Sequence, residues 1–247
     1  MLYEALVRLI QRHAEHRNVK LSDIHGSAAD PWSVDLHFRL SDYVYGIRAL
    51  VSSDVASLIE FGAGLGEIAR DMFCPYPWDD HVACESAFQH AIDQTERRID
   101  VSYLLERNGQ SIGHFFLWKA GGNPQSRAFG LEVPELGVAI VDTQVGRGFG
   151  SLAVRFLLAV AGGLGSDAVE LTTARDNEAG WTAYISAGFE YTGMLRVPLQ
   201  VDVTAVEANE VVATRYRTER QMAHVLRTDK REAVLSYLAR KRGEAIE

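Results

Sequence analysis

The chain has 247 residues, of which 47% are hydrophobic and 23% charged, and these fractions are typical of a globular protein rather than a disordered one. Its 33 acidic residues outnumber its 25 basic residues, and the net charge of -8 argues against a nucleic-acid partner. No apolar run approaches the roughly 20 residues of a membrane span, and the N-terminus lacks the basic start and cleavage site of a secretory signal, so we expect no membrane partner.

The N-terminal residues predict an amphipathic helix followed by a strand. The string MLYEALVRLIQRH places Leu6, Leu9 and Ile10 on one helical face, and apolar residues alternate from Val34 to Leu40 as in a half-buried strand. Such an apolar helix face is rarely left bare in a soluble monomer. We therefore expect this segment to pack on the rest of the chain or on a second copy of it, as in a homodimer.

A glycine-rich string follows a predicted strand at 43–51 and a helix whose start is capped by a side chain of residues 52–54. This string, LIEFGAGLGEIA at 58–69, is similar to the first motif of an S-adenosylmethionine methyltransferase. That motif requires the apolar run to be a strand, with a second strand ending in a carboxylate about 20 residues later. Prolines follow instead, so we interpret the glycines as a break between two helices and keep the methyltransferase as the weakest alternative.

The two cysteines, Cys74 and Cys84, are too few for a disulfide framework or a zinc cluster. We expect reduced thiols in a cytoplasmic protein that holds no metal. Cys84 belongs to a predicted helix. After that helix, residues 98–106 and 111–118 predict the two strands of a hairpin, joined by an Arg-Asn-Gly turn.

The central stretch, PELGVAIVDTQVGRGFG from Pro134 to Gly150, predicts a buried strand, a tight turn and the start of a helix. A helix N-terminus leaves backbone N–H groups without partners and attracts anions. Because glycine has no Cβ, Gly146, Gly148 and Gly150 let these amides approach a phosphate closely. Alternate glycines also occur in ordinary strand-to-helix turns, so the pattern by itself leaves both interpretations open.

The remainder of the chain alternates helix and strand. We expect Gly162 and Gly163 to end the helix that starts near Phe149, and residues 168–173 to form a strand, which makes a parallel crossover. The other predicted elements are a helix over 177–187, closing strands after Gly188 with the last at 211–216, and an amphipathic helix over 228–247.

Four of these segments together resemble the GNAT superfamily of CoA-dependent N-acyltransferases, most closely its RimJ/RimL-like branch. The segments are, in order, IRALVSSDVASL, LLERNGQSIGHFFL, ELGVAIVDTQVGRGFG and ELTTARDNEAGWTAYISAGFEYTG, between about Tyr45 and Tyr216. The resemblance implies an α/β (α+β) fold, with a mixed, mostly antiparallel central sheet, a splayed parallel pair of strands and flanking helices. It also divides the chain into an N-terminal extension (1–42), an acetyltransferase domain (43–220) and a C-terminal helical extension (221–247).

The resemblance implies acetyl-CoA as the acyl donor. The pantetheine arm of CoA is expected between the splayed strands and its pyrophosphate on the glycine loop. The family commonly has arginine or glutamine at the head of this loop, where this chain has Val145, but backbone amides do most of the binding. The residues implied in CoA binding are Val138, Ile140, Val141, Val145, Gly146, Arg147, Gly148, Phe149, Gly150, Ser151 and Asn177, of which Asn177 is equally well explained as a helix N-cap.

The reaction implied is direct transfer of the acetyl group to a primary amine of an unidentified acceptor, either a small molecule or a protein N-terminus. It needs a base for the amine, a hydrogen-bond donor for the oxyanion and a proton for the leaving thiolate. Tyr184 is the implied general acid and Glu135 the candidate base, with a packed tyrosine and a solvated glutamate as the structural alternatives. A CoA-binding regulatory or structural protein without catalysis is the alternative function.

Overall fold

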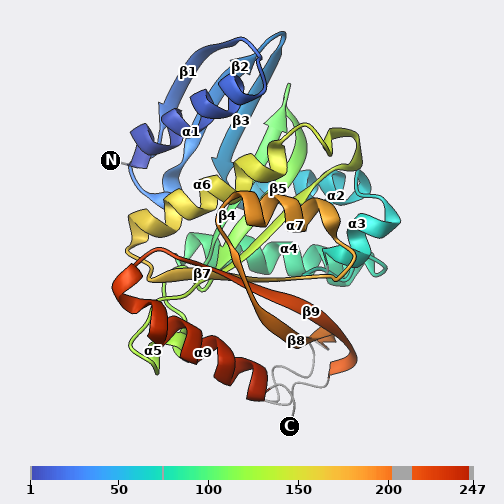
Figure 1. Cartoon of the computed structure of the whole chain (residues 1–247). Coiled ribbons are helices and arrows are strands. Elements are labelled where there is room, and N and C mark those ends of the chain that lie inside the picture. The colour runs from blue at the N-terminus through green and yellow to red at the C-terminus, as the bar shows by residue number, and fades with distance from the viewer. Residues whose placement is uncertain (1, 74, 202–212, 245–247) are drawn as a thin grey trace.

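The computed structural model describes residues 2–73, 75–201 and 213–244, and its centre is one nine-stranded sheet. The strands are β1 (Leu21–Ser27), β2 (Asp35–Leu40), β3 (Tyr43–Ala49), β4 (Val101–Arg107), β5 (Gln110–Trp118), β6 (Glu135–Ile140), β7 (Ala168–Thr173), β8 (Glu190–Val201) and β9 (Ala213–Val225). Their order in the sheet is β1-β2-β3-β4-β5-β6-β7-β9-β8 (Figure 1). Neighbours run antiparallel except for β6 and β7, which run parallel. The predicted fold class is confirmed.

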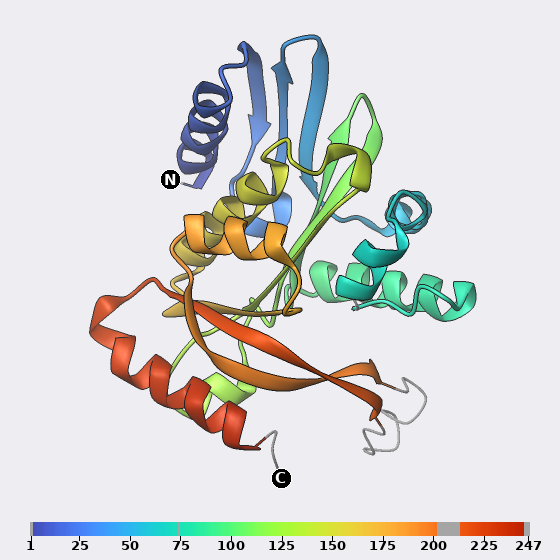
Figure 2. The same ribbon diagram turned by 45° about the vertical axis from the view of Figure 1, so that its right-hand side comes forward.

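Helices cover both faces of this sheet. They are α1 (Leu2–His16), α2 (Val55–Ala63), α3 (Glu67–Met72), α4 (His81–Glu96), α5 (Pro124–Arg127), α6 (Phe149–Leu164), α7 (Glu178–Ser186) and α9 (Arg231–Glu244). Figure 2 shows α1, α6 and α7 on one side of the sheet and α2, α3 and α4 on the other. One face is therefore covered by the three helices that lie between β3 and β4 in the chain, and the other by the N-terminal helix and by the two helices on either side of β7.

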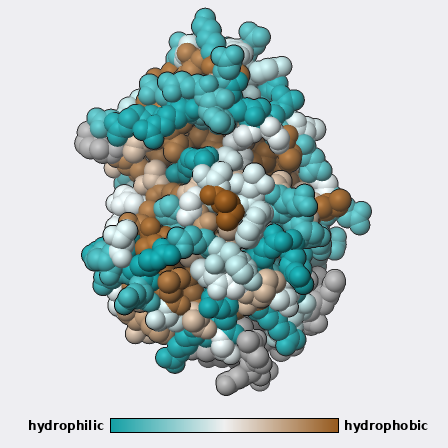
Figure 3. All heavy atoms as spheres, in the orientation of Figure 1, coloured by the Kyte–Doolittle hydropathy of each residue, from teal (hydrophilic) through white to brown (hydrophobic). Residues whose placement is uncertain are grey.

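The N-terminal segment packs on the rest of its own chain, which is one of the two expected outcomes. Leu6 and Ile10 of α1 are fully buried in the same core cluster as Phe149 and Phe156 of α6. Strand β2 extends the sheet by pairing with β3 along its whole length. In Figure 3 the surface over these helices is mostly hydrophilic, with hydrophobic side chains in small separate groups, because the apolar face of α1 is turned inward.

The C-terminal helix closes a smaller core beneath the last strands. Val234, Tyr237 and Leu238 of α9 cluster with Ala168 of β7 and Ala223 of β9. Strand β9 runs on to residue 225, so the predicted domain boundary at 220 falls inside a strand, at the first residue that pairs with β7.

The glycine string at 58–69 is helical on both sides, as interpreted from the sequence. Residues up to 63 form α2, and α3 starts at 67 with Gly66 as its N-cap. Gly64 lets this turn lie against the end of β6, since a Cβ there would be 2.9 Å from Val141 Cγ1. A methyltransferase motif would need a strand where the chain has α2, so this alternative loses its structural basis.

Two local predictions are wrong. Asp54 does not cap α2 with its side chain, because its carboxylate instead binds the guanidinium of Arg48 at 2.6 and 2.8 Å. Gly162 and Gly163 do not end α6. The helix continues to Leu164, and Gly165 ends it because only that glycine takes the left-handed conformation, with φ of 78°.

Two further elements differ from the sequence interpretation. Strand β1 was not expected, because it is mostly exposed and carries a bulge against β2, so its apolar alternation is weak. Strand β9 is longer than the predicted 211–216, of which residues 211 and 212 lie outside the described residues, as does Cys74.

Candidate active site

The parallel strands β6 and β7 separate toward their carboxyl ends. They are paired only at Glu135 and Glu170, next to a hydrogen bond from the Glu170 N–H to the Pro134 carbonyl at 3.0 Å. Strand β7 is fully paired on its other side, with β9. Beyond Glu135 of β6 and Glu170 of β7 the facing edges of the two strands are therefore unpaired, and we call this unpaired stretch the opening.

The edge of β6 that faces this opening offers backbone groups at alternate residues. The Pro134 carbonyl points to β7, whereas the Val141 N–H donates to Ile112 of β5 at 3.0 Å. Because backbone groups alternate sides along a strand, Val138 and Ile140 face the opening. Val141 requires a correction, because its carbonyl also accepts from the Gln144 N–H at 2.9 Å and its N–H is not available to a pantetheine arm.

The loop after β6 leads into a helix start that no side chain caps. Gly146 and Gly148 have φ of 78° and 83°, a conformation that favours glycine, whereas Gly150 is already helical. A Cβ placed on Gly146 or Gly150 would meet no atom within 4 Å, so open space lies above the loop. The first N–H groups of α6 face this space without an intrahelical partner, and they can hold an anion.

The flanks of the loop carry positive charge. Arg147 and Ser151 lie in the predicted loop and first turn, and Val145, at the family's arginine or glutamine position, is 56% exposed. His13 of α1 and Arg17, which directly follows α1, lie beside Gly148, because a Cβ there would be 3.0 Å from His13 Cε1 and 3.5 Å from Arg17 Cδ. Sequence reasoning missed Arg17, since only the tertiary fold brings α1 to this loop.

His13 is neutral at physiological pH. Its ring stacks on Phe149, with 5.7 Å between the ring centroids. Burial, together with the positive charges of Arg17, His16 and Arg155, lowers the pKa of His13 to about 4. The permanent charge that the N-terminal segment brings to the loop is therefore that of Arg17.

Asn177 is the N-cap of α7 in this structure. Its side-chain oxygen accepts from the Gly180 N–H at 2.8 Å, and its amide nitrogen donates to the Thr173 hydroxyl at 3.0 Å. Asn177 therefore has the helix N-cap role that was its structural alternative. A second amide hydrogen stays available at the mouth of the opening, where β7 ends.

Tyr184 is buried, and its phenol has no hydrogen-bond partner among the described residues. It is 7% exposed and contacts Phe189 edge-on, with centroids 6.0 Å apart. Burial and the nearby carboxylate of Glu219 raise the pKa of Tyr184 to about 12. The phenol therefore keeps its proton at neutral pH, as a general acid must.

Glu219 is a site residue that the sequence interpretation missed, because β9 was expected to end before it. It is 6% exposed and accepts two hydrogen bonds from Arg217, at 2.6 and 2.9 Å, through the same oxygen. Glu219 directly precedes Arg220, the residue of β9 that pairs with Thr173 at the end of β7. Its charge influences Tyr184, so the two groups share one region.

Glu135 lies at the closed end of the opening and is tied to the C-terminal helix. Lys241 Nζ is 3.7 Å from Glu135 Oε2 and 3.1 Å from Glu170 Oε1. The Tyr237 hydroxyl donates to the same Glu170 oxygen at 2.9 Å. Burial raises the pKa of Glu170, which Lys241 counteracts. Sequence reasoning found Glu135 but not the lysine that holds it.

Neither metal ligands nor a membrane helix is found in the part of the chain that the structure describes. No group of three or more histidine, cysteine, aspartate or glutamate side chains could hold a metal ion. None of the described helices is both long and apolar enough to cross a membrane.

Solved structures of acetyltransferases share this fold. An acetyltransferase of the GNAT family from Streptococcus pneumoniae is 17% identical with a TM-score of 0.54, covering 73% of this chain and 98% of its own. RimJ of Mycobacterium smegmatis, in complex with CoA-disulfide, is 13% identical with a TM-score of 0.54, covering 91% and 94%. A spermidine N-acetyltransferase from Vibrio cholerae, in complex with CoA and spermine, is 16% identical with a TM-score of 0.53, covering 73% and 95%.

The sequence itself identifies the family. A search of curated proteins found no match to the chain. Residues 46–190, more than half of the chain, match the acetyltransferase (GNAT) domain family. This range contains the opening, the glycine loop and Tyr184, and it leaves out α1, β9 and α9. The chain therefore belongs to the GNAT acetyltransferase family.

Proposed function

We propose that this protein transfers an acetyl group from acetyl-CoA directly to a primary amine. The observation that carries the proposal is the opening between β6 and β7, which has an uncapped helix start at its mouth and the buried phenol of Tyr184 on α7, for which the described residues supply no hydrogen-bond partner. Pyrophosphate suits the first N–H groups of α6, and the amides of pantetheine suit the backbone groups of Val138 and Ile140. Acetyl-CoA, when bound, supplies the activated acetyl group.

Different side chains carry out the two proton transfers of the reaction, one to the leaving thiolate and one from the amine. Tyr184 donates a proton to the thiolate as it leaves, because its raised pKa keeps it protonated. Glu219 and Glu135 are the two carboxylates that can take the proton of the amine. Both carboxylates are held by a cation, Glu219 by Arg217 and Glu135 by Lys241. Glu219 is the stronger candidate because its charge acts on Tyr184, whereas Glu135 lies at the closed end. A backbone N–H of β6 serves as donor to the oxyanion.

The acceptor is a cationic amine of the kind found at a protein N-terminus or in a polyamine. The side chains of Glu135, Glu170 and Glu219 lie on the side of the sheet away from α6. Lys241 pairs with the first two and Arg217 with the third, so carboxylates outnumber the cations that pair with them near the opening. The RimJ/RimL-like branch is supported by the M. smegmatis structure, which covers nine-tenths of this chain.

The test is release of free thiol from acetyl-CoA with a panel of acceptors, namely peptides with free N-termini, spermidine and an aminoglycoside. We expect at least one amine to accelerate release above the hydrolysis background, and Glu219→Gln to slow it more than Glu135→Gln does. Thermal shift with CoA and with S-adenosylmethionine is measured alongside, because only a ligand of the folded state raises the melting temperature. Stabilisation by CoA without turnover on any amine would support the CoA-binding alternative.

A further inference from the structure

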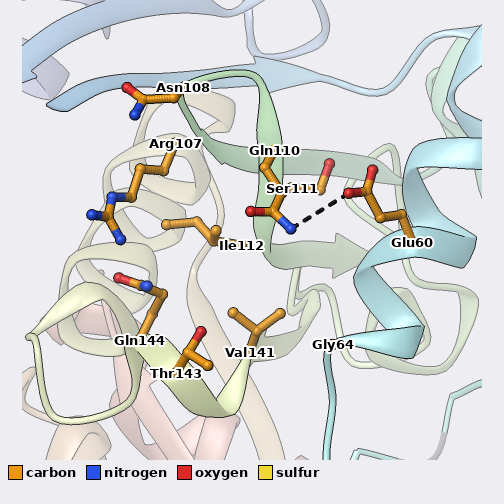
Figure 4. A pocket seen from close by; sticks show the side chains of 10 residues that line it. All are labelled: Glu60, Gly64, Arg107, Asn108, Gln110, Ser111, Ile112, Val141, Thr143 and Gln144. Atoms are coloured by element: carbon orange, nitrogen blue, oxygen red, sulfur yellow. Dashed lines mark hydrogen bonds between the residues drawn. The ribbon is translucent and has the colours of Figure 1, made fainter.

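A second polar pocket lies next to the glycine loop, on the α2 side of the sheet (Figure 4). Its volume is about 320 Å³, at the lower end of the range for small-molecule sites. Walls come from α2, from the turn between β4 and β5, and from residues 141–144 after β6. None of its lining residues belongs to the proposed base or acid of acetyl transfer.

One wall of the pocket presents a cation without a hydrogen-bonding partner. The guanidinium of Arg107 lies 3.5 Å above the ring of Tyr43. Its Nε is buried and makes no hydrogen bond, and no hydrogen bond or ion pair is found for the rest of the group among the described residues. A ring face holds the charge in place but satisfies none of its N–H groups. Such a cation is suited to an anionic group that enters the pocket.

The facing wall presents an acceptor without a donor. Gln144 is 5% exposed, and its buried Oε1 has no hydrogen-bond partner within residues 2–73, 75–201 and 213–244. Figure 4 shows the side chains of Arg107 and Gln144 directed toward one another across the pocket, with Ile112 between them and Val141 below. Buried polar atoms in native proteins are nearly always paired, so this donor and this acceptor at one pocket are suited to a ligand that pairs with both.

The far wall adds a negative charge. Glu60 of α2 lies opposite Arg107, and its carboxylate accepts a long bond, 3.5 Å, from the Gln110 amide. The pocket therefore offers one cation, one carboxylate and one free carbonyl oxygen over an apolar floor. A ligand that satisfies all three has a carboxylate for Arg107 and an ammonium group for Gln144 and Glu60.

We propose that this pocket binds a small zwitterion that carries a carboxylate and an ammonium group, as free amino acids do. The pocket is also placed to act on the glycine loop, and this second part rests on the proposed function. The Gln144 backbone bonds to Val141 on one side and to the Arg147 N–H, at 3.4 Å, on the other. A ligand that fixes Gln144 therefore orders the loop and raises the affinity for CoA, and CoA in turn raises the affinity for the ligand.

Thermal shift and calorimetry with the full chain test the site, using the twenty amino acids as probes. Acetate, ethylamine and inorganic phosphate test the carboxylate, the ammonium group and a plain anion separately. We expect at least one amino acid to bind, and to bind at least tenfold more tightly than any of these three. Failure of every amino acid at millimolar concentration, or equal binding of phosphate or acetate, would overturn the proposal.

Substitutions locate the binding. Gln144→Met removes the orphan oxygen and keeps the length of the side chain, and Arg107→Met removes the guanidinium and keeps an aliphatic stem. We expect at least a tenfold loss of affinity in each, with an unchanged or higher melting temperature of the free protein. Arg98→Met is the matched control, because Arg98 also lies over an aromatic ring, that of Trp32, but away from the pocket. Wild-type affinity in both pocket variants would overturn the assignment. CoA affinity is then measured with and without the amino acid, and an unchanged value would overturn the coupling while leaving the site.

Discussion

Tyr184 is the residue on which the proposed chemistry depends most. Tyr184→Phe removes the phenolic proton and keeps the ring packed on Phe189. Because the proton is needed only as the thiolate leaves, we expect turnover to fall by about 10²-fold with little change in the KM for acetyl-CoA. Steady-state kinetics with a good acceptor measures both. Tyr191→Phe is the control, since Tyr191 is half exposed on β8. Equal turnover in the two variants would make Tyr184 a packing residue.

His114 makes the stability of the fold depend on pH. Its Nδ1 lies 3.1 Å from the Tyr103 carbonyl oxygen, and because a carbonyl can only accept, Nδ1 carries the proton and donates it. In the neutral ring Nε2 then accepts from the Tyr76 hydroxyl at 2.7 Å. Burial lowers the pKa of His114 to about 4, below the value near 6.5 of the unfolded chain. The unfolded state thus binds more protons between these values, and stability rises with pH from about 4 to 6.5 and is lost on acidification.

We expect the free energy of unfolding to fall between pH 7 and pH 5, with His114 contributing about 2 kcal/mol of the loss. His13, whose pKa is also lowered to about 4, acts in the same direction. Urea denaturation at the two pH values measures the loss. The loss of stability should be smaller in the double variant His114→Phe and Tyr76→Phe, in which no hydroxyl is left unpaired by the change. It should be unchanged in the control His81→Gln, because His81 is exposed. A loss of the same size in the double variant would contradict the assignment.

Among the elements, helix α6 offers two glycines that separate ligand binding from helix stability. Gly150 and Gly162 both lie within the helix, and a Cβ on either meets no atom within 4 Å. We expect Gly150→Val to abolish CoA binding, because its branched side chain fills the space above the first N–H groups, whereas Gly162→Val binds CoA normally. Calorimetry with CoA measures the difference. Similar affinity in both variants would remove the pyrophosphate from this helix start.

Gly148 is a less suitable probe of the same site. Its φ of 83° disfavours any other residue, and His13 lies 3.0 Å from where its Cβ would be. We therefore expect Gly148→Val to lower stability as well as CoA binding. A loss of CoA affinity there would not distinguish a blocked site from a distorted loop, which is why the pair at 150 and 162 is preferred.

The N-terminal segment contributes a charge to the loop as well as apolar surface to the core. Arg17, which directly follows α1, lies beside Gly148, whereas Arg12 is exposed on α1. We expect Arg17→Gln to weaken CoA binding by about tenfold, as is typical of one charge-assisted contact to phosphate, and to reduce its dependence on salt. Arg12→Gln carries the same change of net charge and should bind CoA as the wild type does. Loss of the same size in both would indicate a general effect of charge.

At the scale of the whole molecule, Lys241 joins the C-terminal helix to the strands of the opening. It is the cation next to Glu170, which is 1% exposed and hydrogen-bonded to Tyr237. Lys241→Met leaves that carboxylate buried without its cation, and we expect a loss of about 3–5 kcal/mol in the free energy of unfolding. Adding Glu170→Gln should restore much of the loss. Denaturant unfolding of the two variants tests this, and additive losses would contradict a paired charge.

Much of the architecture could be predicted from the chain, because it depends on local patterns. The limits of β7, the helical character of the string at 58–69 and the turn into α6 follow from apolar periodicity and from the positions of glycine. Strand β1 could not be found in this way, since an exposed, bulged edge strand has little apolar alternation. The end of α6 was misplaced, because the sequence does not show which of three nearby glycines turns left-handed.

The sequence by itself determined the family, the fold class and the stretch from Pro134 to Gly150, since periodicity and glycine spacing are written in consecutive residues. Only the tertiary structure decided which distant side chains meet there. It brought Arg17 to the loop, Glu219 to Tyr184 and Lys241 to Glu135, and it set Arg107 against Gln144 across a pocket. Such pairs depend on strand order and helix packing, and these are set by the burial of the whole core rather than by any local run of residues.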